Sequence, residues 1–209
     1  MQKIIIPFSK EEEIGSMAIL NQRLDSLQKQ TIDNAPWPAF PYQPSVSFSI
    51  SYSHTSILLK YFVDEKMVRA AAGKTGGNVW EDACVEFFIS FDEAGYYNIE
   101  FNCIGTGLVG FGKGKESRMM LPIDVIQKIE FSCALHNNSG TIHWELTLKI
   151  PLTIFTFHHL TSLKGQTCRA NFYKCGDELE EPHFLSWSPI SSPEPNFHLP
   201  QFFGKLFFE

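Results

Sequence analysis

The chain has 209 residues and a formal net charge of −6, from 17 basic and 23 acidic side chains. A chain of this length can bury a core large enough to fold as one domain without disulfides or a structural metal. It has no cluster of lysine and arginine of the kind that binds a phosphate backbone, so we expect no nucleic-acid partner. No stretch approaches the roughly 18 apolar residues of a membrane helix, so we expect no membrane partner.

The N-terminus does not have the pattern of a secretion signal. Its apolar run from Ile4 to Ile6 is short, and acidic residues follow soon after. The five cysteines are odd in number and scattered, which favours free thiols in a reducing compartment. We therefore expect a cytoplasmic protein as given, or a secreted or periplasmic one if a leader has been removed. The side chains of adjacent His158 and His159 diverge on most backbones, and Cys168 and Cys175 are seven residues apart, so the spacing predicts no metal and no cofactor.

The first predicted element is a helix. Apolar residues from Lys10 to Lys29 fall mostly three or four positions apart, and Ser9 is a suitable N-cap. Four prolines between Thr31 and Pro44 then predict an extended connection. We expect residues 1–43 to form this helix and connection, packed on a domain of residues 44–209.

The rest of the chain has the pattern of strands. Between Ser45 and Ser53, apolar residues alternate strictly with serines, which predicts a half-buried strand. Further strands are expected at 57–63, 84–91, 96–104, 130–136, 142–150, 167–175, 183–187 and 202–208, with short helical turns at 124–129 and 152–160. Many short strands and little helix predict an all-β fold, an antiparallel β-sandwich or jelly roll with a short N-terminal helix.

The segment from Gly105 to Gly110 has the glycine spacing of a dinucleotide-binding motif. Gly112 and Gly114 follow at once, and neither favours the helix start that would hold a pyrophosphate. We expect a mobile glycine-rich loop that ends near Arg118.

Side-chain parity along the predicted strands indicates a polar sheet face. Successive side chains of a strand point to opposite faces, so polar residues here share a face away from their apolar neighbours. These residues are Glu86, Asn98, Glu100, Asn102 and Lys174, and Trp80 and Trp187 flank them in the sequence. Carboxylates and amides bind hydroxyls, and indole rings pack on the CH faces of pyranoses, so this face suits a sugar. The alternative is an ordinary solvent-facing side of an antiparallel sheet.

The segment from Trp80 to Ile89 resembles the signature of family 9 carbohydrate-binding modules, which occur attached to xylanases and have DOMON-like relatives. Asn171–Asp177, Leu185–Ser188 and Phe203–Leu206 resemble later parts of the same family. The resemblance covers roughly Pro44 to Phe208. It implies a DOMON-like β-sandwich that binds a mono- or oligosaccharide without catalysis.

In that family two tryptophans sandwich one sugar, commonly the terminal unit of a chain. The resemblance implies that the ligand-binding residues are Trp80, Glu86, Glu100, Asn102, Lys174 and Trp187. To these we add Arg118, because the glycine-rich loop can supply its guanidinium. Glu100 stands where the xylanase-linked module has a basic residue, and Lys174 stands where it has an amide. The structural calcium of some members is not expected, because no run of acidic loop residues is present.

Two other functions stay open. Glu86 and Glu100 lie on neighbouring predicted strands, at a separation compatible with the carboxyl pair of a retaining glycoside hydrolase. A DOMON-like binder of haem or another small ligand is the third possibility, with His54, His183 and His198 as available axial ligands.

Overall fold

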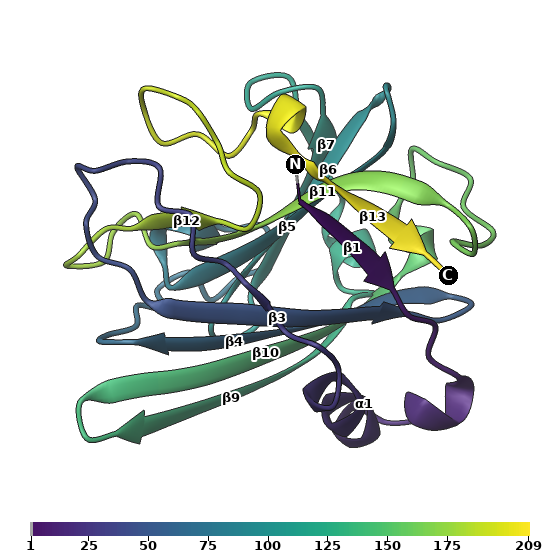
Figure 1. The fold of residues 1–209 in the computed structure, drawn as a ribbon, viewed down its shortest axis with the longest axis horizontal. Helices are drawn as coiled ribbons and strands as arrows, with labels where there is room; N and C mark the ends of the chain where they lie inside the picture. The colour runs from purple at the N-terminus through teal and green to yellow at the C-terminus, as the bar shows by residue number, and fades with distance from the viewer. Residues whose placement is uncertain (1) are drawn as a thin grey trace.

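The computed structural model describes residues 2–209, which form two packed β-sheets (Figure 1). The larger sheet has the order β1-β13-β11-β5-β6-β7-β8, with β12 paired to β11, and the smaller has the order β2-β3-β4-β10-β9. An all-β sandwich with a short N-terminal helix is therefore confirmed. Every strand pair is antiparallel within residues 2–209 except β1 with β13, which is parallel.

The strands of the larger sheet are β1 (Lys3–Ile6), β5 (Cys84–Asp92), β6 (Gly95–Asn102), β7 (Gly107–Gly112), β8 (Met119–Met120), β11 (Thr167–Cys175), β12 (Phe184–Ser186) and β13 (Gly204–Phe208). Those of the smaller sheet are β2 (Gln30–Thr31), β3 (Ser45–Tyr52), β4 (Ser56–Glu65), β9 (Glu130–Asn138) and β10 (Thr141–Pro151). The helical segments are η1 (Glu11–Glu13), α1 (Met17–Asp25), η2 (Val79–Glu81), α2 (Ile123–Ile126), η3 (Leu152–Ile154) and η4 (Pro200–Phe202).

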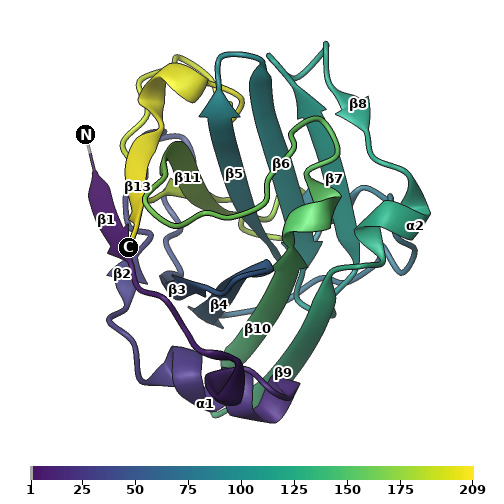
Figure 2. The ribbon, with the colours of Figure 1, turned by 90° about the vertical axis from the view of Figure 1, so that its right-hand side faces the viewer.

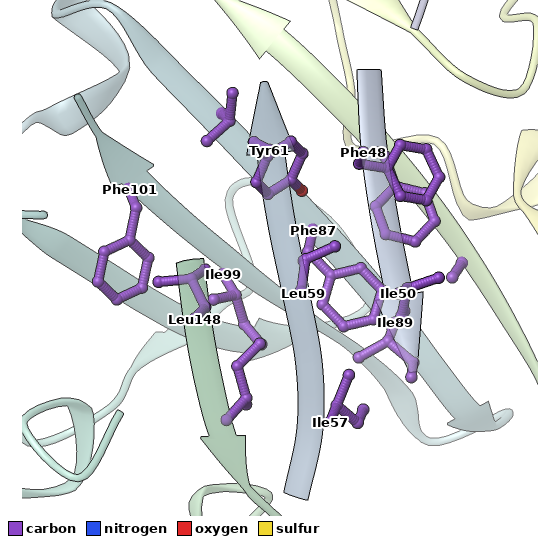
Figure 3. Close-up of a cluster of buried hydrophobic side chains, with 14 of the residues drawn as sticks. Phe48, Ile50, Ile57, Leu59, Tyr61, Phe87, Ile89, Ile99, Phe101 and Leu148 are labelled. Carbon is purple, nitrogen blue, oxygen red and sulfur yellow. The ribbon is translucent and has the colours of Figure 1, made fainter. Parts of the chain in front are cut away.

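The main core lies between the two sheets (Figure 3). It forms because alternate residues of each strand face the other sheet, as the parity of the sequence predicts. Phe172 of β11 stacks between Phe48 of β3 and Phe87 of β5, with ring centroids 3.8 Å and 4.9 Å away. A second cluster of buried apolar residues covers the outer face of the larger sheet.

The predicted N-terminal helix is present but shorter than expected. It is divided into η1 and α1, and Ser16 rather than Ser9 caps α1 by accepting a hydrogen bond from the backbone N–H of Ile19 at 3.3 Å. Gly15 and Ser16 favour a break here, because glycine is costly inside a helix and serine is a strong N-cap. Figures 1 and 2 show α1 against the outer side of the smaller sheet, where Leu20 packs near Leu58.

The expected glycine-rich loop is instead strand β7, which pairs with β6 and β8. Its glycines mark close approaches rather than mobility. A Cβ on Gly110 would lie 2.7 Å from Asn98 Oδ1, and one on Gly112 would lie 2.6 Å from Arg118 Cα. The missing side chains thus let Arg118 lie across the sheet next to Asn98.

The first 43 residues contribute strands to both sheets. β1 pairs with β13 at one edge of the larger sheet, where both chain ends lie (Figures 1 and 2), and β2 pairs with β3. A boundary between residues 43 and 44 stays a prediction. No helix within residues 2–209 has the length and apolarity needed to span a membrane.

Candidate functional site

A pocket of about 120 Å³ opens on the outer face of the larger sheet. Strands β5, β6 and β11 supply its floor, and the segment before η4 supplies one wall. The lining residues are Trp80, Glu86, Glu100, Lys115, Arg118, Cys175, Asp177, Phe184, Pro195, Asn196, Phe197 and His198. The pocket is small beside the roughly 300–1,000 Å³ of sites for drug-sized ligands, so it suits one small ring or the end of a chain.

Two glutamates form the centre of the floor. Glu86 of β5 lies directly opposite Glu100 of β6, and their side chains are 4% and 2% exposed. Burial raises the pKa of both carboxyls, and for Glu86 the nearby charge of Glu100 raises the pKa further. The guanidinium of Arg118 opposes this rise at Glu100, so Glu86 is the more readily protonated of the two.

Glu100 is held in place by donors from both sides. Asn98 Nδ2 donates to Glu100 Oε1 at 2.7 Å, and Arg118 Nη1 approaches the same oxygen at 3.1 Å. Glu86 has no comparable partners. Its hydrogen-bond partner within the described chain is the thiol of Cys175, 3.3 Å from Oε1. The floor therefore carries a buried carboxyl with unused hydrogen-bonding capacity that faces the pocket.

His198 continues the Arg118 network along the wall. Arg118 Nη1 also donates to His198 Nε2 at 3.0 Å, because a guanidinium has no acceptor. Nδ1 then carries the hydrogen and donates to Tyr96 Oη at 2.8 Å. Burial, followed by the charge of Arg118, lowers the pKa of His198 to about 3, so its imidazole is neutral. His198 is thus neutral with both ring nitrogens occupied, which positions Arg118 and leaves His198 no free nitrogen for an axial ligand bond.

Trp80 is placed at the pocket by η2 and by the anchoring of its backbone. Asp177 N–H donates to Trp80 O at 3.1 Å. Two residues on, buried Asp82 accepts from the backbone N–H groups of Ala71 and Ala72 at 2.9 Å. Burial alone would raise the pKa of Asp82, but these bonds hold it below its ordinary value. The side chain of Trp80 is half-buried and lines the pocket.

Asn102, a predicted ligand-binding residue, is committed elsewhere. Its Nδ2 donates to Asp82 Oδ2 at 2.9 Å and to Ala72 O at 3.0 Å. Its Oδ1 accepts from the backbone N–H of Thr106 at 2.9 Å. Asn102 lies on the predicted face of β6 but does not line the pocket, because its side chain hydrogen-bonds Asp82 and the turn after β6.

The predicted placement of Lys174 on the outer face is wrong. Tyr173 and Cys175 belong to the outer cluster, so Lys174, of opposite parity in β11, points between the sheets and is 0% exposed. Its Nζ donates to Cys175 O at 2.9 Å and to His183 Nε2 at 2.8 Å, and pairs with Glu65 Oε2 at 3.0 Å. An ammonium with three partners has no donor left for a ligand.

The predicted stacking role of Trp187 does not fit its position. Trp187 is 3% exposed and packs in the main core, with its ring centroid 5.6 Å from that of Phe172 and 6.3 Å from that of Phe48. In the run from Phe184 to Trp187, alternate side chains face outward and inward, and Phe184 is the one at the pocket. The parity of β12 thus selects Phe184, whereas the family resemblance had indicated Trp187.

The sequence interpretation missed several lining residues. Cys175 and Phe184 could have been found by applying parity to β11 and β12, once the inward side of each was known. Lys115, Asp177, Phe197 and His198 come from irregular segments, where no periodicity reports direction. Asp177 also lines the pocket, although the residue is exposed, and partial desolvation raises the pKa of its carboxyl to about 6.

Comparison with known proteins gives the family. The model of carbohydrate-binding family 9 matches residues 17–208. A candidate carbohydrate-binding protein from Bacteroides uniformis ATCC 8492 is 39% identical, with a TM-score of 0.89 over 100% of this chain and 99% of that one. The comparison with curated proteins finds no match.

Two structures of a family 9 module from Caldicellulosiruptor kristjanssonii share the fold. The module in complex with cellotriose is 10% identical, with a TM-score of 0.65 over 100% of this chain and 94% of that one. The module in complex with glucose is 12% identical, with a TM-score of 0.60 over 100% of this chain and 96% of that one. Since the family model spans nearly the whole sequence, this chain belongs to carbohydrate-binding family 9.

Proposed function

We propose that the pocket on the outer face of the larger sheet binds one neutral sugar unit without catalysis. Family membership supports carbohydrate binding. The observation that carries the assignment to this pocket is the pair of buried carboxyls, Glu86 and Glu100, beside an aromatic side chain that lines the same hollow. Buried acids that keep open capacity toward a cavity are suited to bind hydroxyl groups.

Trp80 provides the apolar contact. One face of a pyranose ring presents CH groups, which pack favourably on an indole. Trp80 packs in part against the outer cluster, and its half-buried side chain also lines the pocket. Phe184 and Phe197 add apolar lining nearby and take the place expected for a second tryptophan.

The polar lining matches hydroxyls better than a charged sugar. Glu86, Glu100 and Asp177 accept hydrogen bonds, and the first also donates when protonated. Lys115 and Arg118 donate, but three acids offset their charge. The pocket therefore has no excess of positive charge for a carboxylate or sulfate group, and we infer a neutral sugar.

The small volume favours a single unit, such as the terminal residue of a chain. The distant C. kristjanssonii module is in complex with glucose in one structure and cellotriose in another, so these are the first ligands to test. If the site holds one terminal unit, cellotriose and glucose should bind with affinities within about tenfold, or about 1.4 kcal/mol.

Glycoside hydrolysis is a second candidate because Glu86 and Glu100 form a directly opposed pair. Directly opposed residues have Cβ atoms about 5 Å apart, which is compatible with a retaining mechanism, in which one carboxyl is protonated and the other is anionic. Binding alone explains the same pair. Release of glucose from cellotriose that Glu86→Gln abolishes would establish the enzyme, and intact cellotriose after prolonged incubation supports the binding module.

The experiment for the binding function is a tryptophan-fluorescence and calorimetric titration with glucose and cellotriose, on protein treated with a chelator. We expect a saturable response that Glu86→Gln weakens. Glu93→Gln is the matched control, because Glu93 lies in the turn after β5 and its side chain is 93% exposed. No saturable response to any sugar of a broad panel, from folded protein, would overturn the assignment.

A further inference from the structure

Two cysteines lie side by side in the floor of the pocket. Cys84 of β5 and Cys175 of β11 occupy directly opposed positions of an antiparallel pair, so their side chains leave the sheet on the same face. Both are free thiols, and they are 0% and 1% exposed. Neighbouring thiols held by backbone pairing form a site without the short sequence spacing that zinc motifs usually show.

A carboxyl completes the group. Glu86 lies two residues after Cys84 on the same strand and therefore on the same face. One ligand atom from each of Cys84, Glu86 and Cys175 can be chosen so that all three lie within 4.8 Å of one another. Zinc–sulfur bonds of about 2.3 Å and zinc–oxygen bonds of about 2.0–2.2 Å place tetrahedral ligand atoms roughly 3.5–3.8 Å apart, which small side-chain rotations reach.

Of the three groups, Glu86 is the one that the protein satisfies poorly, since Cys84 Sγ also has Val85 O at 3.6 Å and Cys175 Sγ has Trp80 O at 3.7 Å. The carboxyl of Glu86 has the thiol of Cys175 as its hydrogen-bond partner within the described chain, and a thiol is a weak donor. Burial raises the pKa of Cys84 to about 11, and the hydrogen bond with Cys84, followed by burial, raises that of Cys175. A bound cation reverses this balance, because it deprotonates a coordinating thiol and neutralises the carboxylate.

We propose that Cys84, Glu86 and Cys175 bind a thiophilic divalent cation such as Zn²⁺, with an open coordination position toward the pocket. Two sulfur ligands select a soft cation over Ca²⁺ or Mg²⁺, which prefer oxygen. Glu86 and Cys175 line the pocket, so the fourth position is accessible to water or to a ligand hydroxyl. The two thiolates and one carboxylate leave a single negative charge on the filled site, and Arg118 lies close enough to act on Glu86.

The site goes beyond the proposed sugar binding, although the two share Glu86. A sugar hydroxyl becomes the fourth ligand, or the cation withdraws Glu86 from the sugar. Sugar titrations on chelator-treated protein test the first function alone, and metal titrations without sugar test the second alone. Failure of one is therefore distinguishable from failure of the other.

The test is titration of the reduced full chain with Co²⁺ and, separately, with Zn²⁺ under equilibrium dialysis. We expect one equivalent of metal and a thiolate-to-cobalt charge-transfer absorption. Cys84→Ser and Cys175→Ser should each weaken binding at least tenfold. Cys168→Ser and Cys133→Ser are the matched controls, since one removes a buried thiol of the core and the other an exposed thiol of β9.

Metal binding without the charge-transfer absorption, or binding that all four cysteine variants affect equally, would overturn the site. If Cys84→Ser or Cys175→Ser fails to fold, X-ray absorption at the zinc edge of the unaltered protein decides. Two sulfur ligands support the proposal, and a coordination shell of nitrogen and oxygen alone contradicts it.

Discussion

Both faces of the larger sheet bury ionisable side chains, but these side chains have different numbers of partners within the protein. Between the sheets, Glu65 pairs with Lys174 and accepts from Trp144 Nε1 at 2.5 Å, and His183 uses both ring nitrogens. On the outer face, the carboxyl of Glu86 is left with a thiol. The inner group, Glu65 with Lys174, Trp144 and His183, is paired within the protein, although Glu65 Oε2 has only ion-pair contacts and accepts no hydrogen bond among residues 2–209. The outer group, Glu86 with Cys175, lies at the pocket and keeps hydrogen-bonding capacity for a ligand.

Under the proposed sugar binding, this difference distinguishes structural from ligand-binding polar residues better than residue type does. A buried polar group costs free energy unless it is paired, so breaking a paired group destabilises the fold, whereas an underpaired one at a cavity has capacity to bind a ligand. Sequence similarity placed Lys174 and Glu86 in one site. The structure places them on opposite faces of the same two paired strands.

The largest expected effect is a difference in the free energy of unfolding between alanine variants of Trp187 and Trp80. Trp187→Ala removes a core side chain and should lower the free energy of unfolding by about 3–5 kcal/mol, measured by urea denaturation. Trp80→Ala should cost far less stability and instead weaken sugar binding. The same loss of stability from both variants would contradict the division.

Lys174→Met tests the inner group. It leaves Glu65 buried without its cation, so the free energy of unfolding should fall by about 3–5 kcal/mol. Lys149→Met is the control, because its pair with Glu130 is partly exposed and is worth less than about 1 kcal/mol. The folded fraction of Lys174→Met should keep its sugar affinity. A loss of sugar affinity without a loss of stability would show that Lys174 acts in ligand binding after all.

Glu86→Gln tests the outer group. Removing a buried carboxyl that faces Glu100 should leave stability unchanged or raise it, because mutual repulsion is relieved. Sugar affinity should fall by about 1.5–3 kcal/mol, the range for hydrogen bonds to charged groups, as measured by calorimetry. A large loss of stability with unchanged affinity would make Glu86 a structural residue.

The pH dependence of the free energy of unfolding should reveal that His183 is held neutral in the folded protein. Burial, followed by the charge of Lys174, lowers its pKa to about 3, while the unfolded chain has the ordinary value near 6.5. The unfolded state therefore binds the proton first as pH falls. The stability due to neutral His183 is fully present above pH 6.5 and is lost as pH falls toward about 3, by up to about 1.4 kcal/mol per pH unit.

His183→Gln is the comparison for this dependence, because an amide keeps the acceptor for Lys174 without titrating. Lys174, Glu65 and Tyr42 lie next to the His183 ring and are unchanged in the variant, so the difference between the two stability curves isolates His183. Parallel curves between pH 6.5 and 4 would show that His183 is not held neutral.

Strict alternation was enough to predict most of the sandwich. Ser45–Tyr52 and Thr141–Pro151 became long central strands because one set of side chains faces the core. The glycines of β7 misled the interpretation, since their role depends on Asn98 and Arg118, which approach from elsewhere in the chain. The short β1 has no alternation and exists because the edge of β13 is available.

Site residues could be predicted in strands where one set of alternate side chains is clearly apolar and so marks the side that faces the core. Glu86 and Glu100 line the pocket. Their outward direction could be predicted because their apolar neighbours on the same strands show which side faces the core. In β11 both sides are buried, so parity could not tell whether Tyr173 or Lys174 faces the core. His198 comes from an irregular segment, and its position depends on packing against Tyr96 and Arg118.

The most direct test of the open outer group is a crystal structure of the chelator-treated chain soaked with cellotriose. We predict a terminal sugar ring packed on Trp80, with a hydroxyl within hydrogen-bond distance of Glu86 or Glu100. A sugar bound at another surface, with the pocket beside Trp80 holding only water, would contradict the account.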